Sequence, residues 1–255
     1  MDTPFTLTHT AQSSKKALPL PHMQKLKMQI GKVLEVAFMP KARNPSYEMQ
    51  VHFSHDEIKT SCGQLVDNYT VQELHEQQIL AITNFAPKRI AGIKSQALTL
   101  GFSDKPQSRQ AIYLTPGEPV PDGTCINFAS EGAWEPEADF AYFLALDIRS
   151  ATIKNIQTVG GYTLAHTDLG EMGESIAWIP GDLQQVKNYI GEQVAVWMNP
   201  MPSVQGLPFQ SILLVAPLEK YDHTITENYL ASKEVHVPVT LVKVSKPVDN
   251  GLALF

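Results

Sequence analysis

The chain has 255 residues, of which 43% are hydrophobic and 18% charged, and its net charge is −6. This composition provides enough apolar surface for a folded core and excludes a largely disordered chain. No run reaches the roughly 18 apolar residues of a membrane helix, and the N-terminus has no leader-like apolar stretch, so we expect a cytoplasmic protein. The length allows one large domain or two domains of about 100–130 residues.

Charge is divided unevenly between the two halves. Residues 1–128 carry 13 Lys and Arg against 11 Asp and Glu, a net charge of +2, whereas residues 129–255 carry 7 against 15, a net charge of −8. We therefore expect a polyanionic partner to meet the first half. Cys62 and Cys125 lie 63 positions apart. This spacing fits neither a zinc site nor a disulfide framework, and it predicts two buried free thiols.

The predicted elements of the first half follow one another as three strands, one short helix and two strands. The second of these strands, Tyr47–Phe53, alternates apolar and polar residues with period two, which is typical of a half-buried strand. Thr70 and Glu73 have the spacing of a capping box and begin the helix. This order is that of an OB-fold, a five-stranded Greek-key barrel. The strands are predicted at 26–38, 47–53, 58–66, 78–85 and 95–102.

The second half repeats this order, which predicts a tandem duplication. Asn84-Phe85-Ala86-Pro87 and Asn199-Pro200-Met201-Pro202 lie 115 positions apart, and a five-residue deletion upstream pairs Val33 with Ile153. The shift of 115 also pairs Tyr47 with Tyr162, Val71 with Val186 and Gln78 with Gln193. It predicts strands at 143–156, 162–169, 175–179, 193–198 and 209–215, and a helix near 182–189.

The repeat divides the chain into four parts: an N-terminal extension (1–22), an OB-fold domain (23–128), an acidic linker (129–139) and a degenerate second OB-fold domain (140–255). Each copy is predicted to carry an apolar tail, at 111–128 and at 228–244. The fold class is therefore all-β dominated, with two barrels and a short helix in each.

An OB barrel binds its ligand on the face of its second and third strands and with the loops after its first and fourth strands. In the first half both loops are basic, and polar residues lie near them in the sequence. Cations suit phosphate contacts, and neighbouring amides and hydroxyls suit base edges. Solvated loop lysines without a ligand are the alternative. The candidate site residues are Lys41, Arg43, Asn44, Ser61, Gln64, Asn84, Lys88, Arg89, Lys94 and Ser95.

The corresponding loops of the second half, 157–161 and 200–209, contain no cation. The alignment replaces Ser61, Gln64 and Ser95 with Ile176, Ile179 and Phe209, which turns a polar mouth into an apolar one. We interpret the second copy as a structural partner that has lost the site. The alternative is a new apolar groove, suited to peptide, on Trp178, Trp197 and Phe209.

Several motifs carry a resemblance to a known family. They are Gly31-Lys32-Val33, Ala42-Arg43-Asn44-Pro45-Ser46-Tyr47, Thr60-Ser61-Cys62-Gly63-Gln64, and the stretch from Asn84-Phe85-Ala86-Pro87 to Gly92-Ile93-Lys94-Ser95-Gln96. On these residues the segment 26–102 resembles the CsaA-type proteins of the tRNA-binding domain superfamily. These are free-standing relatives of the C-terminal appendage of bacterial methionyl-tRNA synthetase and of the EMAP-type cytokine domain.

The resemblance implies an OB-fold that dimerises through its terminal extensions, binds tRNA and catalyses no reaction. The polar pocket of the family maps onto Ser61, Gln64, Asn84, Lys88, Arg89 and Ser95. Two positions depart from the pattern: Gln96 stands where the family usually has an acidic residue, and Cys62-Gly63 stands where CsaA-type proteins prefer Ser-Ala.

Because both barrels lie in one chain, we expect a monomer that acts as a pseudo-dimer and binds tRNA or another structured RNA through the first barrel. One alternative is an export-related chaperone of the CsaA type that binds unfolded peptides. Another is a scaffold that lends a tRNA-binding module to an aminoacyl-tRNA synthetase. No phosphate-binding glycine loop or nucleophile motif is present, and His52 and His55 lack a third metal ligand, so we expect neither enzyme activity nor a cofactor.

Overall fold

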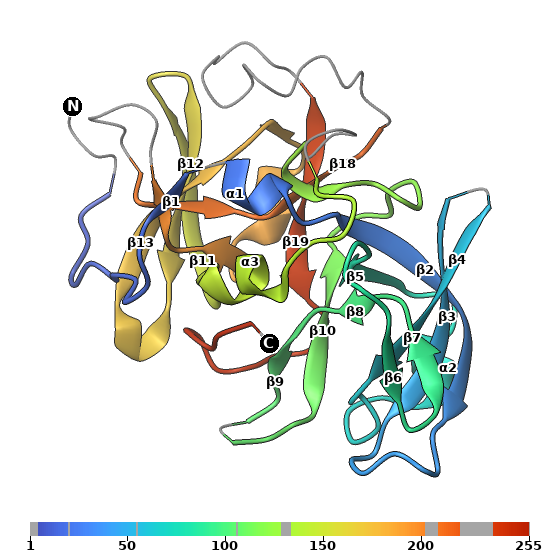
Figure 1. Ribbon diagram of the computed structural model, residues 1–255. Helices are drawn as coiled ribbons and strands as arrows, with labels where there is room; N and C mark the ends of the chain where they lie inside the picture. The colour runs from blue at the N-terminus through green and yellow to red at the C-terminus, as the bar shows by residue number, and fades with distance from the viewer. Residues whose placement is uncertain are drawn as a thin grey trace.

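Strands dominate the protein, and its helices are short (Figure 1). The computed structural model describes residues 5–19, 21–54, 56–105, 107–128, 134–201, 209–219 and 237–254. Within these ranges, no helix is long and apolar enough to cross a membrane. The expected all-β class is confirmed.

The first half forms a closed five-stranded barrel, as predicted. Its sheet has the order β4-β3-β2-β5-β8, and a parallel bridge between Ser61 and Ala97 closes it. Along β3 alternate residues are buried, beginning at Tyr47 and ending at Phe53, which confirms the predicted period of two. The strands are β2 (Met28–Phe38), β3 (Tyr47–Ser54), β4 (Glu57–Gly63), β5 (Gln78–Ile82) and β8 (Leu98–Thr99).

Gly31 is required where β2 passes over the core of this barrel. A Cβ atom at Gly31 would lie 2.5 Å from Cε1 of Phe53 and 2.7 Å from Cγ1 of Val51, and both of these side chains are fully buried. No larger residue fits there without displacing the core. The glycine thus lets β2 run close to the neighbouring strand.

The capping box at the short helix α2 (Val71–Leu74) is present. The Thr70 side chain accepts a hydrogen bond from the Glu73 N–H, and the Glu73 carboxylate accepts one from the Thr70 N–H. Lys246, near the C-terminus, donates to the same carboxylate at 3.1 Å and to the Asn68 carbonyl. The helix of the first half is therefore held by the last part of the chain.

The second half contains the same set of strand pairings. β11 pairs with β12 and β15, β12 pairs with β13, and β17 pairs with β15 and, in parallel, with β13. Both β2 and β11 carry a bulge, after Val33 and after Ile153 respectively. The strands are β11 (Ile148–Val159), β12 (Tyr162–Asp168), β13 (Glu174–Ile179), β15 (Gln193–Trp197) and β17 (Ser211–Leu213).

The strand register corrects the alignment of the two halves by one residue. Val33 faces Val51 in the first half and Ile153 faces Thr167 in the second, so the shift between β3 and β12 is 116 positions and not 115. The position equivalent to Ser61 is accordingly Ala177 instead of Ile176, and the one equivalent to Tyr47 is Thr163 instead of Tyr162. Relative to the β2–β3 hairpin, the β11–β12 hairpin with its turn at Gly160-Gly161 is four residues shorter. The fifth missing residue lies between β13 and β15, because Gln78 and Gln193 remain 115 positions apart, and no side-chain pattern marks it.

Three predicted elements differ from the structure. The segment 143–156 begins in a helix, α3 (Phe140–Ala145), because the Asp139 side chain caps it by accepting from the Ala141 N–H. The predicted helix near 182–189 is a two-residue strand, β14 (Asp182–Leu183), and a 3-10 turn, η3 (Val186–Tyr189). The strand predicted at 95–102 is broken where the Gln96 and Ala97 N–H groups both donate to the Thr60 carbonyl. It divides into β7 (Ile93–Ser95), β8 and β9 (Gly101–Ser103).

The tail of the second half also lies further along the chain than predicted. The Gln78 side chain exchanges two hydrogen bonds with the Val120 backbone, and Gln193 does the same with Val248. The counterpart of residues 111–128 therefore runs from 239 towards the C-terminus, instead of over 228–244. Residues 228–236 of the predicted tail lie outside the described residues.

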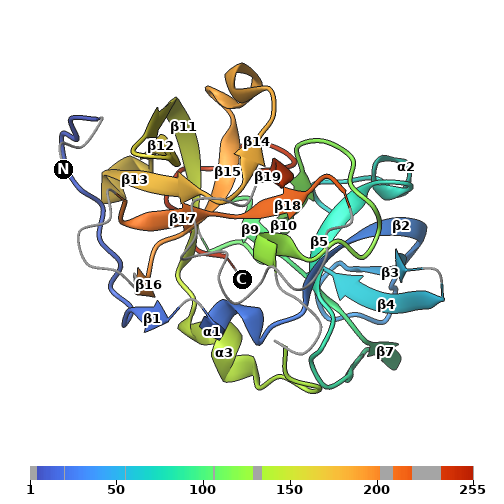
Figure 2. The ribbon, with the colours of Figure 1, turned by 90° about the horizontal axis from the view of Figure 1, so that it is seen from above.

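Two tail strands join the halves. β10 (Ala111–Pro116) pairs in antiparallel fashion with β19 (Pro238–Val244), placing Leu114 opposite Val244 and Pro116 opposite Val242. Viewed from above, they lie at the centre of the molecule between the two sets of strands (Figure 2). One continuous hydrophobic cluster contains buried residues of both halves, and a second cluster fills the inside of the second half.

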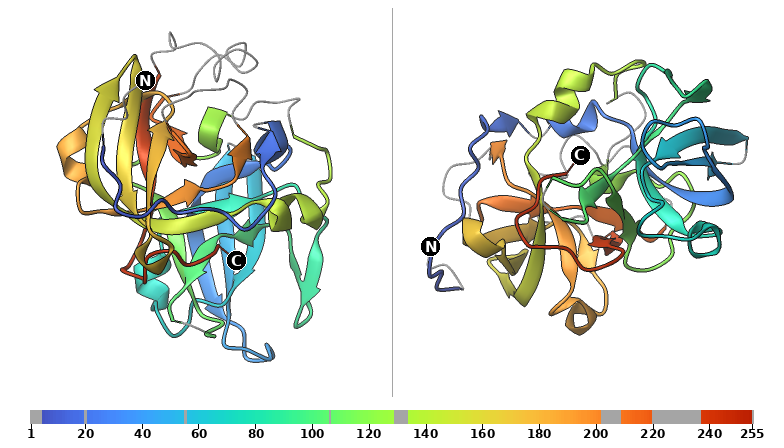
Figure 3. Two further views of the ribbon diagram at one scale, coloured as in Figure 1. Left: turned by 90° about the vertical axis from the view of Figure 1, so that its left-hand side faces the viewer. Right: turned by 90° about the horizontal axis from the view of Figure 1, so that it is seen from below.

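Each half is also clasped by a segment that precedes the other half. Residues 5–19 run along the second half and end in β1 (Leu18–Pro19), which pairs with β16 (Pro200–Met201), and the Leu18 N–H donates to the Asn199 carbonyl at 2.8 Å (Figure 3). Residues 134–139 run along the first half, where the Ala138 N–H donates to the Asn84 carbonyl, also at 2.8 Å. We call these two segments the arms.

The first arm is anchored on Glu174. Its carboxylate accepts from the Thr8 N–H at 2.9 Å, from the Thr8 hydroxyl at 3.0 Å and from Lys154 at 3.0 Å. These contacts, led by the Thr8 N–H and followed by Lys154, lower the pKa of the Glu174 carboxyl to about 2. The charged form of Glu174 therefore holds the arm on β13.

We expect Glu174→Gln to lower the free energy of unfolding at pH 7 by about 1–2 kcal/mol, because hydrogen bonds to a charged acceptor are stronger than those to an amide. The pKa of Glu174 lies below the unfolded value of about 4.3, so its stabilisation is complete above that pH and is lost as the pH falls towards 2. Wild type should therefore lose more stability than the variant between neutral and acidic pH. Urea unfolding at pH 7 and pH 3 measures this. Glu171→Gln, at an exposed neighbouring acid, is the control, and equal acid sensitivity of wild type and Glu174→Gln would contradict the assignment.

Candidate nucleic-acid interface

A short hairpin carries three of the predicted cations. It consists of β6 (Lys88–Ile90) and β7, joined by a two-residue turn in which Ala91 and Gly92 both have positive φ. Lys88, Arg89 and Lys94 are exposed, and Arg89 lies directly opposite Lys94 across the hairpin. Like charges in opposite positions destabilise a pair of strands. An anion bound at the hairpin would offset this repulsion.

The loop between β2 and β3 carries the other two predicted cations. Lys41 and Arg43 are exposed, and Asn44 is half-buried with its carbonyl accepting from the Ser46 hydroxyl. Figures 1 and 3 place this loop and the β6–β7 hairpin at the same end of the first barrel. None of the five cations forms an ion pair within the described part of the chain, whereas Lys25, Lys27, Lys32, Lys59, Lys154 and Lys246 all do.

A groove of about 520 Å³ lies between the hairpin and the start of α3. Its floor and walls are mainly apolar, and Lys88, Ser95 and Gln96 supply polar groups. Two of its residues, Ala138 and Phe140, belong to the arm and helix of the second half. Its lining consists of Cys62, Phe85, Ala86, Lys88, Ile90, Ser95, Gln96, Ala97, Leu98, Ala138 and Phe140.

The polar candidates Ser61, Gln64 and Asn84 point away from this groove or are already occupied. Ser61 is fully buried, donates to the Ala97 carbonyl and shares a hydrogen bond with the Thr99 hydroxyl. The Gln64 carbonyl accepts from the Ala111 N–H, while the Gln64 side-chain oxygen is buried without a partner among the described residues. The structure therefore places Lys88 and Ser95 in the groove lining, Arg89 and Lys94 on the same hairpin outside the lining, and Lys41, Arg43 and Asn44 on the neighbouring loop.

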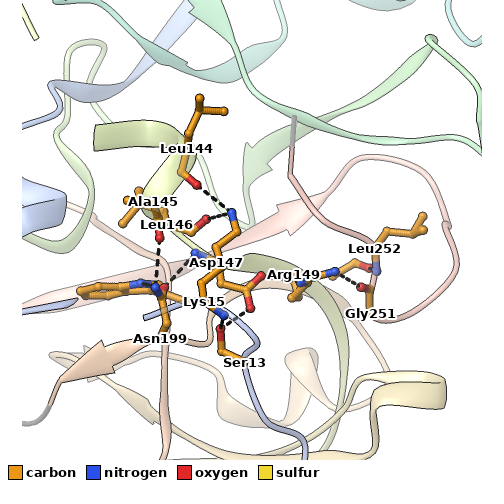
Figure 4. Close-up of polar contacts among 12 residues, drawn as sticks. Ser13, Lys15, Leu144, Ala145, Leu146, Asp147, Arg149, Asn199, Gly251 and Leu252 are labelled. Atoms are coloured by element: carbon orange, nitrogen blue, oxygen red, sulfur yellow. Dashed lines mark hydrogen bonds and ion pairs between the residues drawn. The ribbon is translucent and has the colours of Figure 1, made fainter. Parts of the chain in front are cut away.

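Asn84 holds the second arm against the first barrel. Its side-chain oxygen accepts from the Lys27 N–H at 2.9 Å, and its amide donates to the Lys25 and Glu135 carbonyls, each at 2.9 Å. Asn199 makes the same three contacts with Asp147, Ala145 and Lys16 (Figure 4). All three of these hydrogen bonds join the Asn84 side chain to backbone groups of the protein. The Asn84 side chain therefore positions the wall of the groove.

The residue that donates its N–H to this clamp differs between the two halves, being Asp147 in the second half. Its carboxylate is buried and accepts from Arg149 at 2.6 Å and from the Ser13 hydroxyl at 2.6 Å (Figure 4). The equivalent position of the first half holds Lys27, which pairs with Glu57 at 3.6 Å. A buried charge needs such partners, and here the first arm supplies one of them.

Sequence reasoning missed Phe85, Gln96 and Phe140 as lining residues. Gln96 gave a signal, since it occupies a position where the resembling family carries an acid. Phe140 gave none, because it lies 44 positions beyond Gln96 and the pairing of the arm alone brings it to the groove.

Cys62 also lies on the groove and is only half-buried, which corrects the expectation of two buried thiols. Burial raises the pKa of both the Cys62 and the Cys125 thiol, and both are free.

In the second half, aromatic rings occupy the positions that correspond to the groove of the first half. Phe209, the counterpart of Ser95, stacks on Trp178 with ring centroids 5.4 Å apart, and Tyr162 contacts both rings. Trp197 is buried and donates its ring N–H to Asn199, so it is not available to line a surface groove. Residues 202–208 of the loop predicted at 200–209 lie outside the described residues.

The histidines that were considered as metal ligands give no metal site in the described part of the chain. His52 lies 2.8 Å from the Asp122 carboxylate, and His55 is outside the described residues. No group of three or more His, Cys, Asp or Glu able to hold a metal occurs within the described ranges.

Comparison with known proteins gives a consistent family. Residues 28–124 match the family model described as "Putative tRNA binding domain". Methionine–tRNA ligase of Flavobacterium johnsoniae is 23% identical over 117 residues, which cover 46% of this chain and 16% of that one. The ligase of Pyrococcus abyssi is 32% identical over 102 residues, covering 40% and 13%. The chain thus spans about a sixth of the length of these relatives. The solved structure of the chaperone CsaA from Bacillus anthracis is 32% identical, with 42% and 96% coverage and a TM-score of 0.39.

We expect Asn84→Ala to lower the free energy of unfolding by about 2–3 kcal/mol, because it leaves buried backbone groups of both the barrel and the arm without partners. Asn199→Ala should have a similar effect, since it removes the matching clamp. Lys88→Ala, at an exposed position of the same groove, should change stability by less than about 0.5 kcal/mol. Urea unfolding of the three variants measures this. An Asn84→Ala protein as stable as wild type would contradict the positioning role.

Proposed function

Since residues 28–124 belong to the family described as putative tRNA-binding domains, we propose that this protein binds tRNA or another structured RNA, without catalysis and in the cytoplasm, through the end of the first barrel that carries the hairpin and the β2–β3 loop. The contact residues we propose are Lys41, Arg43, Asn44, Lys88, Arg89 and Lys94, together with Ser95 in the groove lining, whose buried hydroxyl also donates to the Ala97 carbonyl. Ser61 and Asn84 are hydrogen-bonded within the protein and hold the backbone around the groove, and Gln64 completes the set expected from the sequence.

The observation that carries this proposal is the group of five exposed cations without acidic partners. The chain has a net charge of −6, and most other lysines among the described residues are paired with a carboxylate. A group of unpaired cations at one end of a barrel creates a local positive potential, which attracts phosphates and is stabilised by them. The first half also carries the positive part of the charge, +2 against −8.

We propose further that the chain is an intrachain pseudo-dimer of two OB-like barrels. The repeated strand pairings, the matching Asn84 and Asn199 clamps and the reciprocal arms support this. At the centre, the Gly117 N–H donates to the Leu241 carbonyl and the Ser245 N–H donates to the Tyr113 carbonyl, as a two-fold relation between the halves would require. In this arrangement the first barrel binds RNA and the second supports it.

Titration with tRNA at two salt concentrations tests the RNA function. Wild type should bind more weakly as salt rises, and Lys88→Ala/Arg89→Ala should bind more weakly at low salt. Removing two phosphate contacts should also reduce the slope of log K against log salt by about 1.4–1.8. The slope separates a loss of phosphate contacts from a loss of folding.

Lys16→Ala/Lys187→Ala is the matched control, because it removes two exposed cations near the second half and changes net charge by the same amount. It should retain wild-type affinity. Equal weakening by both double variants would show a general charge effect and would contradict a site at the hairpin. Absence of salt-sensitive binding by wild type would overturn the RNA function.

The second candidate function is binding of unfolded peptide. The specific observation in its favour is the apolar lining of the groove, including Phe85, Ile90 and Leu98. Peptide held on apolar surface should stay bound as salt rises, because salts of the sulfate type strengthen apolar burial. Binding of an unfolded protein that is insensitive to salt, together with no tRNA binding, would favour this candidate. A partner aminoacyl-tRNA synthetase is compatible with either.

A further inference from the structure

Phe140 is an exposed aromatic ring that the second half contributes to the groove of the first. It is 48% exposed, although it is among the largest apolar residues of the chain. Its ring centroid lies 5.4 Å from that of Phe85 and 5.6 Å from that of Phe143. Phe143 is buried in the shared core, so the ring at the groove is backed by fixed neighbours.

The backbone around Phe140 is held as firmly as its ring. Ala138 forms a parallel bridge with Phe85 and donates to the Asn84 carbonyl, and Asp139 caps α3 through the Ala141 N–H at 2.8 Å. The two residues that precede Phe140 are therefore held in place before any ligand binds. An aromatic face held in place in this way loses little conformational entropy on binding.

The hairpin side of the groove supplies its polar groups and, among the described residues, its one cation. Lys88 and Gln96 line it, and Arg89 and Lys94 stand on the outer side of the same hairpin. The groove volume of about 520 Å³ lies within the range of about 300–1,000 Å³ that is typical of small-molecule sites. The site therefore offers a flat apolar face, an amide that can contact a polar edge, and cations at the rim.

Within the described residues, no carboxylate forms an ion pair with Lys88, Arg89 or Lys94, and the acids of the arm lie on the Phe140 side of the groove. Asp139 is committed to capping α3, and Glu135 is paired with Lys25 at 3.5 Å. Glu137 is exposed on the arm. The charge difference between the two sides favours a ligand whose anionic part faces the hairpin.

We propose that the groove holds one unpaired nucleobase of the bound RNA, stacked on Phe140, with the adjoining phosphates on Lys88, Arg89 and Lys94. This inference rests on the proposed RNA function and goes beyond it, since it makes the site a composite of both halves and selects RNA with an unstacked base. Base–aromatic stacking together with a cationic backbone track is the general mode by which proteins hold single-stranded nucleic acid. The pairing of the second arm with the first barrel is what completes the site.

The test compares two RNAs and three variants. We expect Phe140→Leu, which keeps an apolar side chain but removes the aromatic face, to weaken binding of tRNA by about tenfold. Its affinity for a fully base-paired RNA duplex, and the salt dependence of tRNA binding, should stay as in wild type. Phe140→Trp should retain the tRNA affinity. Leu144→Ala, one turn further along α3 and 59% exposed, is the control outside the groove and should bind like wild type.

A single-stranded RNA containing 2-aminopurine gives an independent reading, because stacking on an aromatic ring quenches the fluorescence of this base. Wild type and Phe140→Trp should quench it, and Phe140→Leu should not. Equal tRNA affinity of wild type and Phe140→Leu would overturn the stacking site and leave the proposed RNA function intact. Loss of tRNA binding in Lys88→Ala/Arg89→Ala only, with unchanged quenching in Phe140→Leu, would also overturn it. If wild type binds no RNA, or if Phe140→Leu weakens binding of an unfolded peptide only, the stacking site is overturned along with RNA as its ligand.

Discussion

β10 and β19 pair in antiparallel register at the centre of the molecule, and the rest of the arrangement depends on this contact. Leu114 and Val242 are completely buried there, in the same cluster that contains the core of the first barrel. A strand without a neighbour exposes a row of N–H and C=O groups that can pair with other chains. Each tail strand instead pairs with the other, so neither half can be removed without exposing the edge and the apolar face of the half that remains.

The same constraint explains why the arms cross between the halves. Once the tails are paired at the centre, the segment that precedes each half lies beside the other half. Asn84 and Asn199 hold the crossing segments by contacting backbone groups alone. Backbone contacts do not depend on the side chains of the arm. The clamps therefore tolerate different side chains on the two arms, and the first arm is anchored on Glu174 in addition.

The sequence predicted those parts of the fold whose signals are local. The alternation of β3, the capping box at Thr70 and the order of strands in the first half are all confirmed. Local signals did not predict features that depend on pairing between distant segments. These features are the register of β12, the position of the tail in the second half and the contribution of Phe140 to the groove. At the candidate site, the exposure of the cations followed from their loops, whereas the burial of Ser61 and the clamp of Asn84 depend on partners distant in the sequence.

The two halves share the same strand pairings around the groove position and differ in the side chains found there. In the first half, small or polar side chains at Cys62, Ser95 and Ala97 leave a groove open beside the cationic hairpin. In the second, Trp178 and Phe209 occupy the equivalent positions and stack on each other. Filling a mouth with aromatic side chains buries apolar surface and stabilises the barrel, whereas opposed cations lower stability and the exposed part of Phe140 gains no burial energy. An open mouth with these features is costly for folding, and a ligand that neutralises the cations and covers the ring is the physical reason for a protein to keep it.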